Sequence, residues 1–333
     1  MLRANQAVRL GLRAASRNPE LSFAKALVDQ GGTLLAVLPV LVAAALLARV
    51  LGDGAPLAAL ARLAAMVRTL TLPILGAVLA ATAIGWTLGA FFWSGALPLL
   101  AADAEMNARP PPGNFFLLAS RGFSRVAAAF AVGSLLSLGV SLASGVALVA
   151  AVPVVLANPS PALFGGLALI AAFSVIARFL VDLLARLMLV RAAALGDGAT
   201  AAFHRAAVLL SSRLGACIAI AAAFLVLELV VATAGATISG TMSSAFDTDR
   251  ELLAMAPRIG VGLATAVVFA WLEVGRQGAL AALAAGEEGL IEIPPEPQRH
   301  EPPRPAPAPV ALERPSEGPV AEQVIEALPV DDD

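Results

Sequence analysis

The chain has very little of what water-soluble enzymes are built from. Its 333 residues include no tyrosine, one cysteine and two histidines, and only 14% are charged. A single cysteine excludes an intrachain disulfide, and two histidines are too few for a histidine-based metal site or a Ser-His-acid triad. So few charged residues cannot coat a soluble globule of this length. The composition therefore predicts that lipid surrounds most of the chain.

Long uncharged stretches support this prediction. Hydrophobic residues make up 59% of the sequence, and the mean hydropathy is +0.84. The ranges 30–48, 69–102 and 126–177 contain no charged residue, whereas one helical span needs only about 20 apolar residues. The last range is too long for one span. Its Asn-Pro-Ser-Pro cluster at 158–161 disfavours helix, so a turn is expected there.

The apolar stretches predict an all-α integral membrane protein with six transmembrane helices. No cleavable signal peptide is expected, because charges are scattered through the first 30 residues without an apolar core among them. The first span should therefore remain as an anchor. The six expected spans are 33–51, 70–92, 128–156, 162–188, 214–240 and 258–284.

The distribution of Lys and Arg predicts the orientation. Six spans put both termini on one side, and the span ends on that side carry twelve basic residues against four on the other. Because cytoplasmic loops carry the excess of Lys and Arg, both termini are expected in the cytoplasm. Abundant Arg and Ala with almost no Lys is typical of a GC-rich bacterial genome, which indicates the inner membrane. The twelve are Arg3, Arg9, Arg13, Arg17, Lys25, Arg109, Arg121, Arg125, Arg186, Arg191, Arg205 and Arg213, and the four are Arg62, Arg68, Arg250 and Arg258.

A pattern recurs three times along the chain. A short Arg-bearing amphipathic stretch ends in Ser-Arg and precedes two apolar spans, at Ser16-Arg17, Ser124-Arg125 and Ser212-Arg213. The second span of each pair continues to an acidic residue, namely Asp103, Asp197 and Glu287. The sequence thus predicts three repeats, at about 1–105, 106–198 and 199–290, that bury what their neighbours expose.

The Arg-bearing stretches are expected to be interfacial helices. Their arginines lie on one helical face and their apolar residues on another, so the arginines could bind lipid headgroups while the apolar face enters the bilayer boundary. The alternative is that they are simply cytoplasmic loops that follow the positive-inside rule. The expected headgroup contacts are Arg9, Arg13, Arg17, Arg121, Arg125, Arg205 and Arg213.

Ionisable residues inside the spans are the candidates for activity, since each is costly in lipid and should face a partner or water. They are Glu228, Arg178, Asp182 and Glu273. One interpretation is a polar pathway in which Glu228 exchanges a proton or cation and Arg178 guides an anion. The other is structural: Arg178, Asp182 and Arg186 form a neutralising ladder, and Glu228 is protonated or bonded to a Ser or Thr.

Signatures of catalysis are absent from the sequence. It contains no Gly-rich phosphate loop followed by Lys-Ser/Thr, no H-E-x-x-H and no paired-cysteine motif. We therefore expect neither an enzyme nor a bound cofactor or metal, and no nucleic-acid partner. Cys217 is expected to be a small buried apolar residue.

The C-terminal part changes character from about residue 291. Prolines are frequent from there to the acidic end of the chain, so 291–333 is expected to be a disordered cytoplasmic tail beside a membrane domain at 1–290. Residues 302–307 match a generic P-x-x-P ligand pattern, although a spacer is the simpler interpretation.

The layout of residues 1–290 resembles uncharacterised bacterial polytopic membrane-domain families. The resemblance is carried by the basic amphipathic stretch at 7–13, Ala-Val-Arg-Leu-Gly-Leu-Arg, followed by Arg17-Asn18-Pro19. These families include the membrane region attached to some glycerophosphoryl diester phosphodiesterases. The resemblance implies a fold and no reaction, because that region has no catalytic residues to carry over.

Together these features predict a non-catalytic scaffold or accessory subunit whose partners are membrane lipids and other membrane proteins. A small transporter or channel that uses Glu228 with Arg178 and Asp182 is the alternative. A third class is a regulatory module whose output is the proline-rich tail. A polar cavity that reaches Glu228 would favour the transporter.

Overall fold

The computed structural model describes residues 2–52, 56–106, 112–158, 160–245 and 251–291, and these residues are helical apart from short connections. The predicted all-α class is confirmed. The chain divides into two units, Met1–Ile293 and Pro294–Asp333; the expected proline-rich tail lies outside the described residues. The helices are α1 (Ala4–Arg17), α2 (Pro19–Gly52), α3 (Pro56–Met106), α4 (Phe115–Ala157), α5 (Pro161–Ala194), α6 (Ala199–Ser212), α7 (Leu214–Ala245) and α8 (Glu251–Glu287), with a 3₁₀ turn at Pro112–Asn114.

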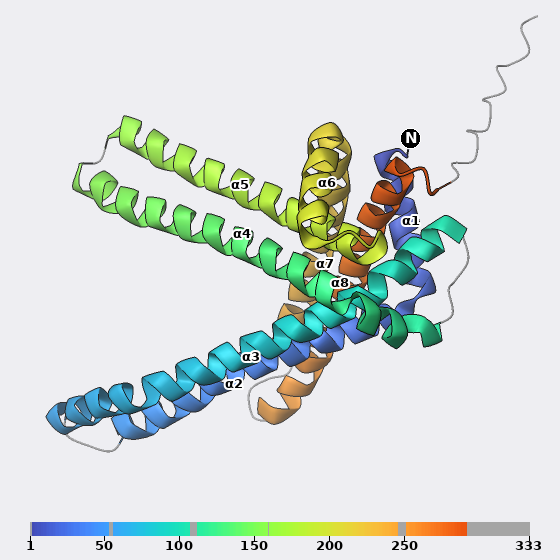
Figure 1. The fold of residues 1–333 in the computed structure, drawn as a ribbon. Helices are drawn as coiled ribbons and strands as arrows, with labels where there is room; N and C mark the ends of the chain where they lie inside the picture. Colours follow the sequence, from blue (N-terminus) through green and yellow to red (C-terminus); the bar gives the residue numbers. More distant parts are fainter. Residues whose placement is uncertain (1, 53–55, 107–111, 159, 246–250, 292–333) are drawn as a thin grey trace, which may run out of the picture. The chain divides into compact units, whose positions relative to one another are not determined.

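Six of these helices are long and apolar enough to cross a membrane, as predicted. They pair in chain order as the hairpins α2/α3, α4/α5 and α7/α8 (Figure 1). The turn expected at the Asn-Pro-Ser-Pro cluster separates α4 from α5. There the Ser160 hydroxyl caps α5 by accepting a hydrogen bond of 3.3 Å from the backbone N–H of Leu163. The chain is therefore a multi-pass membrane protein.

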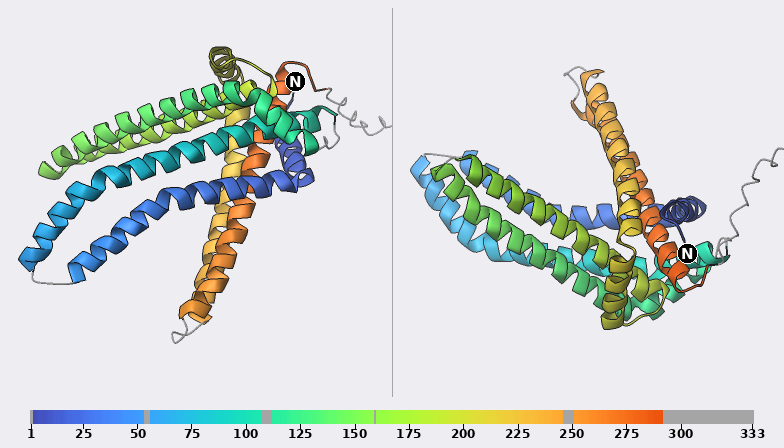
Figure 2. Two further views of the ribbon diagram at one scale, coloured as in Figure 1. Left: turned by 60° about the horizontal axis from the view of Figure 1, so that its bottom comes forward. Right: turned by 90° about the horizontal axis from the view of Figure 1, so that it is seen from above.

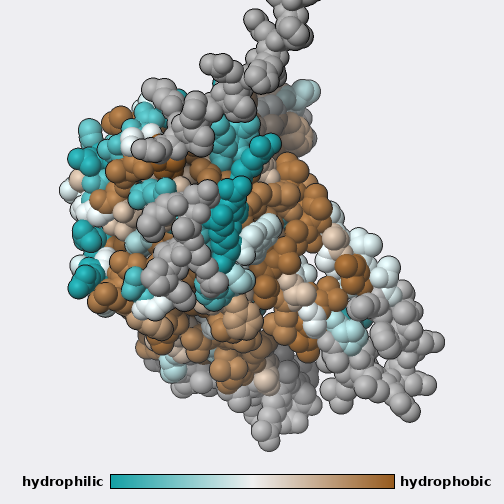
Figure 3. All heavy atoms as spheres, turned by 90° about the vertical axis from the view of Figure 1, so that its right-hand side faces the viewer, coloured by the Kyte–Doolittle hydropathy of each residue, from teal (hydrophilic) through white to brown (hydrophobic). Residues whose placement is uncertain are grey.

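Most of the buried residues lie at one end of the hairpins, which we call the base. The base comprises α1, α6 and the segments 90–104, 183–193 and 270–285 of α3, α5 and α8. The helices α3, α5 and α8 are the second helices of the three hairpins, and each contacts the other two. The hairpins meet at this base (Figures 1 and 2). One face of the base carries hydrophilic patches among apolar ones (Figure 3). The base is therefore where the hairpins are held together.

Beyond the base, the hairpins expose large apolar side chains. Water would make such a surface costly, whereas lipid tails solvate it and the helices satisfy their own backbone groups. These segments therefore carry the membrane-spanning surface. Examples are Leu34, Leu38, Leu72, Leu79, Val149, Leu156, Leu169, Phe173, Ile238 and Leu263.

The three Arg-bearing stretches do not all form separate helices. The first is α1, which ends because Asn18 precedes Pro19 and a residue before proline disfavours helix. The third is α6, which is separated from α7 at Arg213. The second is the first part of α4, which continues through Ser124-Arg125 into the span. No separate short helix forms there, since a helix-forming Val-Ala-Ala-Ala run at 126–129 follows directly.

Each Arg-bearing stretch packs its small-residue face on the second helix of another hairpin. The start of α4 lies on α3, where the Ser94 hydroxyl donates to the carbonyl of Ala119 at 2.9 Å. The helix α6 lies on α5, and α1 lies on α8, where Gly11 meets the backbone of Gly278. Ala15, Ala119 and Ala206 are fully buried in these contacts. These faces thus contact protein, whereas the amphipathic pattern had placed them at the bilayer boundary.

Candidate functional site at the junction of three hairpins

Glu273 of α8 joins the three hairpins. Its carboxylate accepts from the Lys25 ammonium of α2 at 3.0 Å and from the Arg186 guanidinium of α5 at 3.5 Å. The Lys25 side chain is only 7% exposed and that of Arg186 19%. Because an ionised group is costly in such surroundings without an opposite charge, this shared acceptor stabilises both cations.

Two further carboxylates complete what we call the junction cluster: Lys25, Asp29, Asp182, Arg186 and Glu273. Lys25 also binds Asp29 one turn along α2, and its ammonium lies 5.6 Å from the centre of the Trp93 ring. Arg186 also binds Asp182 at 2.8 Å. Each charge in the cluster therefore has an opposite partner.

Glu228, the deepest of the predicted residues, forms a pair of its own. Its carboxylate lies 3.2 Å from the Arg276 guanidinium, which joins α7 to α8. Among the described residues this arginine is the partner that the structure gives Glu228, where the structural interpretation had expected a protonated carboxyl or a Ser or Thr. Arg276 lies one turn from Glu273 on α8, which puts this pair next to the junction cluster without a direct bond to it.

Arg178 is bound differently from what its spacing to Asp182 predicted. Its guanidinium donates to the Ser141 hydroxyl of α4, while Asp182 binds Arg186 on the other side. Among the described residues, Arg178 thus has a neutral partner and no carboxylate.

A cleft of about 450 Å³ opens between α3, α4, α5 and α8. It is polar on two sides, with a row of serines on α4 and charged residues on α5 and α8. Three of the four predicted intramembrane residues line it, and Glu228 does not. The polar residues that line it are Ser134, Ser137, Ser141, Arg178, Asp182, Arg186, Glu273 and Gln277.

The arginine of each Ser-Arg pair binds the end of the second helix in its own hairpin. Arg17 lies 3.2 Å from Asp103, a carboxylate that is 3% exposed. Arg125 donates to the Gly196 carbonyl at 2.9 Å, and Arg213 lies 3.0 Å from Glu287. A cation is favourable at these helix ends because the last carbonyls carry partial negative charge.

Other arginines of the base are also bound to protein. Asp197 accepts from Arg205 and from Arg191, each at 2.9 Å. Arg191 also donates to Glu288, and this hydrogen bond lowers the pKa of the Glu288 carboxyl below its ordinary value.

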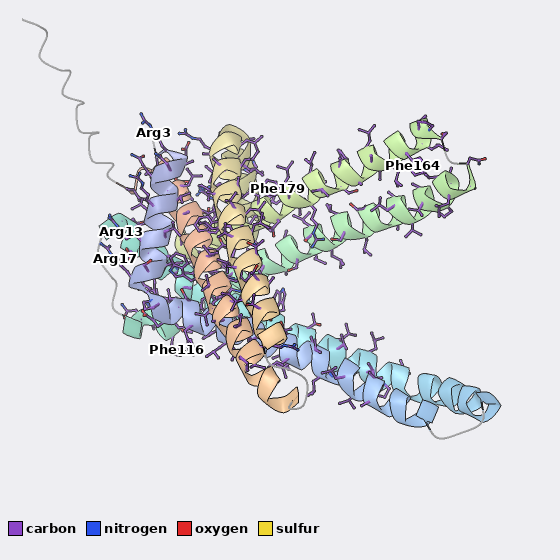
Figure 4. The ribbon with its side chains drawn as sticks, turned by 180° about the vertical axis from the view of Figure 1, so that it is seen from behind. Arg3, Arg13, Arg17, Phe116, Phe164 and Phe179 are labelled. Carbon is purple, nitrogen blue, oxygen red and sulfur yellow. The ribbon has the colours of Figure 1, made fainter. Side chains whose placement is uncertain are left out.

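Several arginines predicted to bind lipid thus make protein contacts, among them Arg17, Arg125, Arg205 and Arg213. Arg9, Arg13 and Arg121 are exposed, and Figure 4 shows Arg13 and Arg17 projecting from α1. Contact of any of these residues with lipid stays a prediction.

Within the described part of the chain, no group of three or more His, Cys, Asp and Glu side chains is placed to hold a metal ion. Cys217 is buried and free, as its apolar surroundings predicted. His204 is exposed on α6.

Sequence reasoning missed the roles of two residues. Lys25 was counted only as a basic residue near a span end, although its spacing of four from Asp29 was a usable signal. Gln277 is 1% exposed. It is uncharged and lies in an apolar helix, so neither charge nor spacing in the sequence indicated that it lines the site.

Comparison of the chain with protein-family models, with curated proteins and with solved structures finds no match.

Proposed function

We propose that this chain is a non-catalytic membrane scaffold or accessory subunit of a bacterial inner membrane. The observation that carries the proposal is that Glu273 binds one cation from each of the other two hairpins. Ionisable groups that are bound to one another across helices hold those helices in place. In a carrier, by contrast, they must be released in each cycle.

Contacts that recur in the three predicted repeats support the same proposal. In each repeat the Ser-Arg arginine binds the end of its own second helix, while the Arg-bearing stretch packs on the second helix of the preceding repeat. The stretch of the first repeat, α1, packs on α8 of the last repeat, so the contacts link all three repeats in a closed cycle. Such closure gives a rigid base from which hairpins can contact lipid and other membrane proteins.

The positions of Arg178 and of Glu273, a member of the junction cluster, along their helices support a base at the cytoplasmic surface. From Arg178 to the start of α5 at Pro161 the helix is about 26 Å long, and from Glu273 to the start of α8 at Glu251 about 33 Å. Both lengths are close to the hydrocarbon thickness of about 30 Å. With the excess of basic residues on that side, this orientation puts both termini in the cytoplasm.

A small carrier is the second candidate, because a polar cleft lies among the predicted intramembrane residues. The cleft reaches Arg178, Asp182 and Glu273. Against it, Glu228 does not line the cleft and is bound to Arg276.

Replacement Glu228→Gln separates the two candidates. If the pair is structural, the variant should lose about 2 kcal/mol of unfolding free energy, because Arg276 keeps its charge and loses its acceptor. Proton uptake by proteoliposomes should equal that of protein-free vesicles for both the native chain and the variant. Denaturant titration in detergent and a pH-sensitive dye inside the vesicles provide the two measurements.

Glu105→Gln is the matched control, since Glu105 is exposed at the end of α3, and its unfolding free energy should change by less than about 0.5 kcal/mol. Proton uptake by the native chain that disappears in Glu228→Gln and persists in Glu105→Gln would establish the carrier instead.

A further inference from the structure

The cleft contains a cation without an acidic partner. Four charged side chains line it, and three of them are bound to one another, since Arg186 binds both Asp182 and Glu273. The fourth, Arg178, has only the Ser141 hydroxyl among the described residues. An arginine in an apolar span is stabilised by an anion, and no carboxylate of the described chain supplies one there.

The cleft also contains a buried acceptor without a donor. Gln277 lines it and is 1% exposed, and its carboxamide oxygen has no hydrogen-bond partner in the described residues. A buried carbonyl left unpaired costs about 1–3 kcal/mol, so a ligand that donates to it gains affinity. The cleft therefore offers a cation and an acceptor to one molecule.

The remaining walls fit an amphiphile. Trp93 and Phe130 provide aromatic surface, and the hydroxyls of Ser134 and Ser137 lie on the α4 side near Arg178. Measured along α5, the distance from the α4/α5 loop to Arg178 in the cleft is close to the hydrocarbon thickness of a bilayer. This is the level at which phospholipid headgroups lie.

From these features we propose that the cleft binds a phosphate ester that also carries a hydrogen-bond donor, supplied by a phospholipid headgroup such as phosphatidylglycerol. The phosphate binds the Arg178 guanidinium and the α4 hydroxyls. The headgroup hydroxyl donates to the Gln277 carboxamide oxygen, and the acyl chains leave along α5 toward the α4/α5 loop, where exposed apolar side chains such as Leu169 and Phe173 lie. Asp182, Arg186 and Glu273 of the junction cluster also line the cleft, but the proposed lipid contacts use Arg178, the α4 hydroxyls and Gln277.

The test uses the full chain in maltoside micelles, titrated with dihexanoyl-phosphatidylglycerol and followed by native mass spectrometry. We expect one tightly bound lipid per chain. Dihexanoyl-phosphatidylcholine, which has no donor on its headgroup, should bind at least tenfold more weakly. Arg178→Gln should weaken phosphatidylglycerol binding at least tenfold, and Arg178→Lys, which keeps the charge but loses the planar fork, should weaken it less. Arg258→Gln removes an exposed arginine of α8 that lies outside the cleft and should leave affinity unchanged.

A thermal melt of each variant establishes that it is folded. Equal affinity of the native chain and Arg178→Gln for phosphatidylglycerol would overturn the site, and so would an equal loss in Arg258→Gln, which indicates attraction by net charge alone. Glycerol phosphate that binds as tightly as the lipid would keep the phosphate chemistry and overturn the lipid as its source. None of these outcomes depends on the proton-uptake assay, so the site and the scaffold proposal fail separately.

Discussion

Replacement of Gly11 by alanine should release α1 from α8 and destabilise the base by about 3 kcal/mol. A Cβ at this position would lie 2.2 Å from the Gly275 carbonyl oxygen and 2.5 Å from the Ala279 backbone nitrogen. Both atoms belong to helix backbone and cannot move aside. The two helices must separate, which exposes the buried Ala7, Ala14 and Ala15.

The matched control is Gly139→Ala in α4, where nothing lies within 4 Å of the added Cβ. Because alanine is the better helix former, this variant should gain about 0.5–1 kcal/mol. Denaturant titration in detergent measures both variants. If Gly11→Ala is as stable as the native chain, α1 does not pack on α8 through this glycine.

Glu273→Gln is expected to be the most damaging single charge removal, with a loss of about 3 kcal/mol in unfolding free energy. The substitution is nearly isosteric and leaves Lys25 and Arg186 charged and largely buried, without the acceptor they share. All three hairpins lose a connection at once. Denaturant titration in detergent should therefore show a lower unfolding midpoint for the whole base and not for one hairpin alone.

Asp29→Asn is the comparison, because Asp29 binds the same lysine. Its side chain is 45% exposed and Lys25 keeps Glu273, so the loss should be less than about 1 kcal/mol. Equal losses in the two variants would mean that Glu273 does not connect the hairpins more strongly than an exposed pair does.

The number of membrane helices could be predicted from the sequence, because hydropathy and length are sufficient for a span. The start of the first could not, since its span was expected at 33–51 and the helix begins at Pro19. The turn at 158–161 was predictable for a local reason, the two prolines. The continuity of α4 through Arg125 was not, since the triplicate pattern treats the three stretches alike, whereas Pro19 follows only the first of them.

The packing of the Arg-bearing stretches could not be predicted from amphipathicity. Alanine and glycine on a helix face fit either a lipid boundary or another helix at close approach. The sequence contains no signal that distinguishes Gly11, which meets α8, from Gly139, which meets nothing.

The candidate site was partly predictable. The cost of a charge in lipid pointed to Arg178, Asp182 and Glu273, and the structure brings these three to one cleft. Their partners could not be derived, because Glu273 and Lys25 are far apart in the sequence. Spacing along one helix suggested Arg178 with Asp182, but Asp182 binds Arg186.

The central claim is that three hairpins cross the bilayer from a single base, and cysteine accessibility tests it most directly. Cys217→Ala removes the only cysteine, so single cysteines can be placed at the exposed Ser16 of α1, Ser124 in the part of α4 that packs on the base, and Ser211 of α6, and at Asn158 between α4 and α5. With a membrane-impermeant maleimide, the three base positions should react only from the cytoplasmic side and Asn158→Cys only from the opposite side. Reaction of Asn158→Cys and Ser124→Cys from the same side would contradict the account.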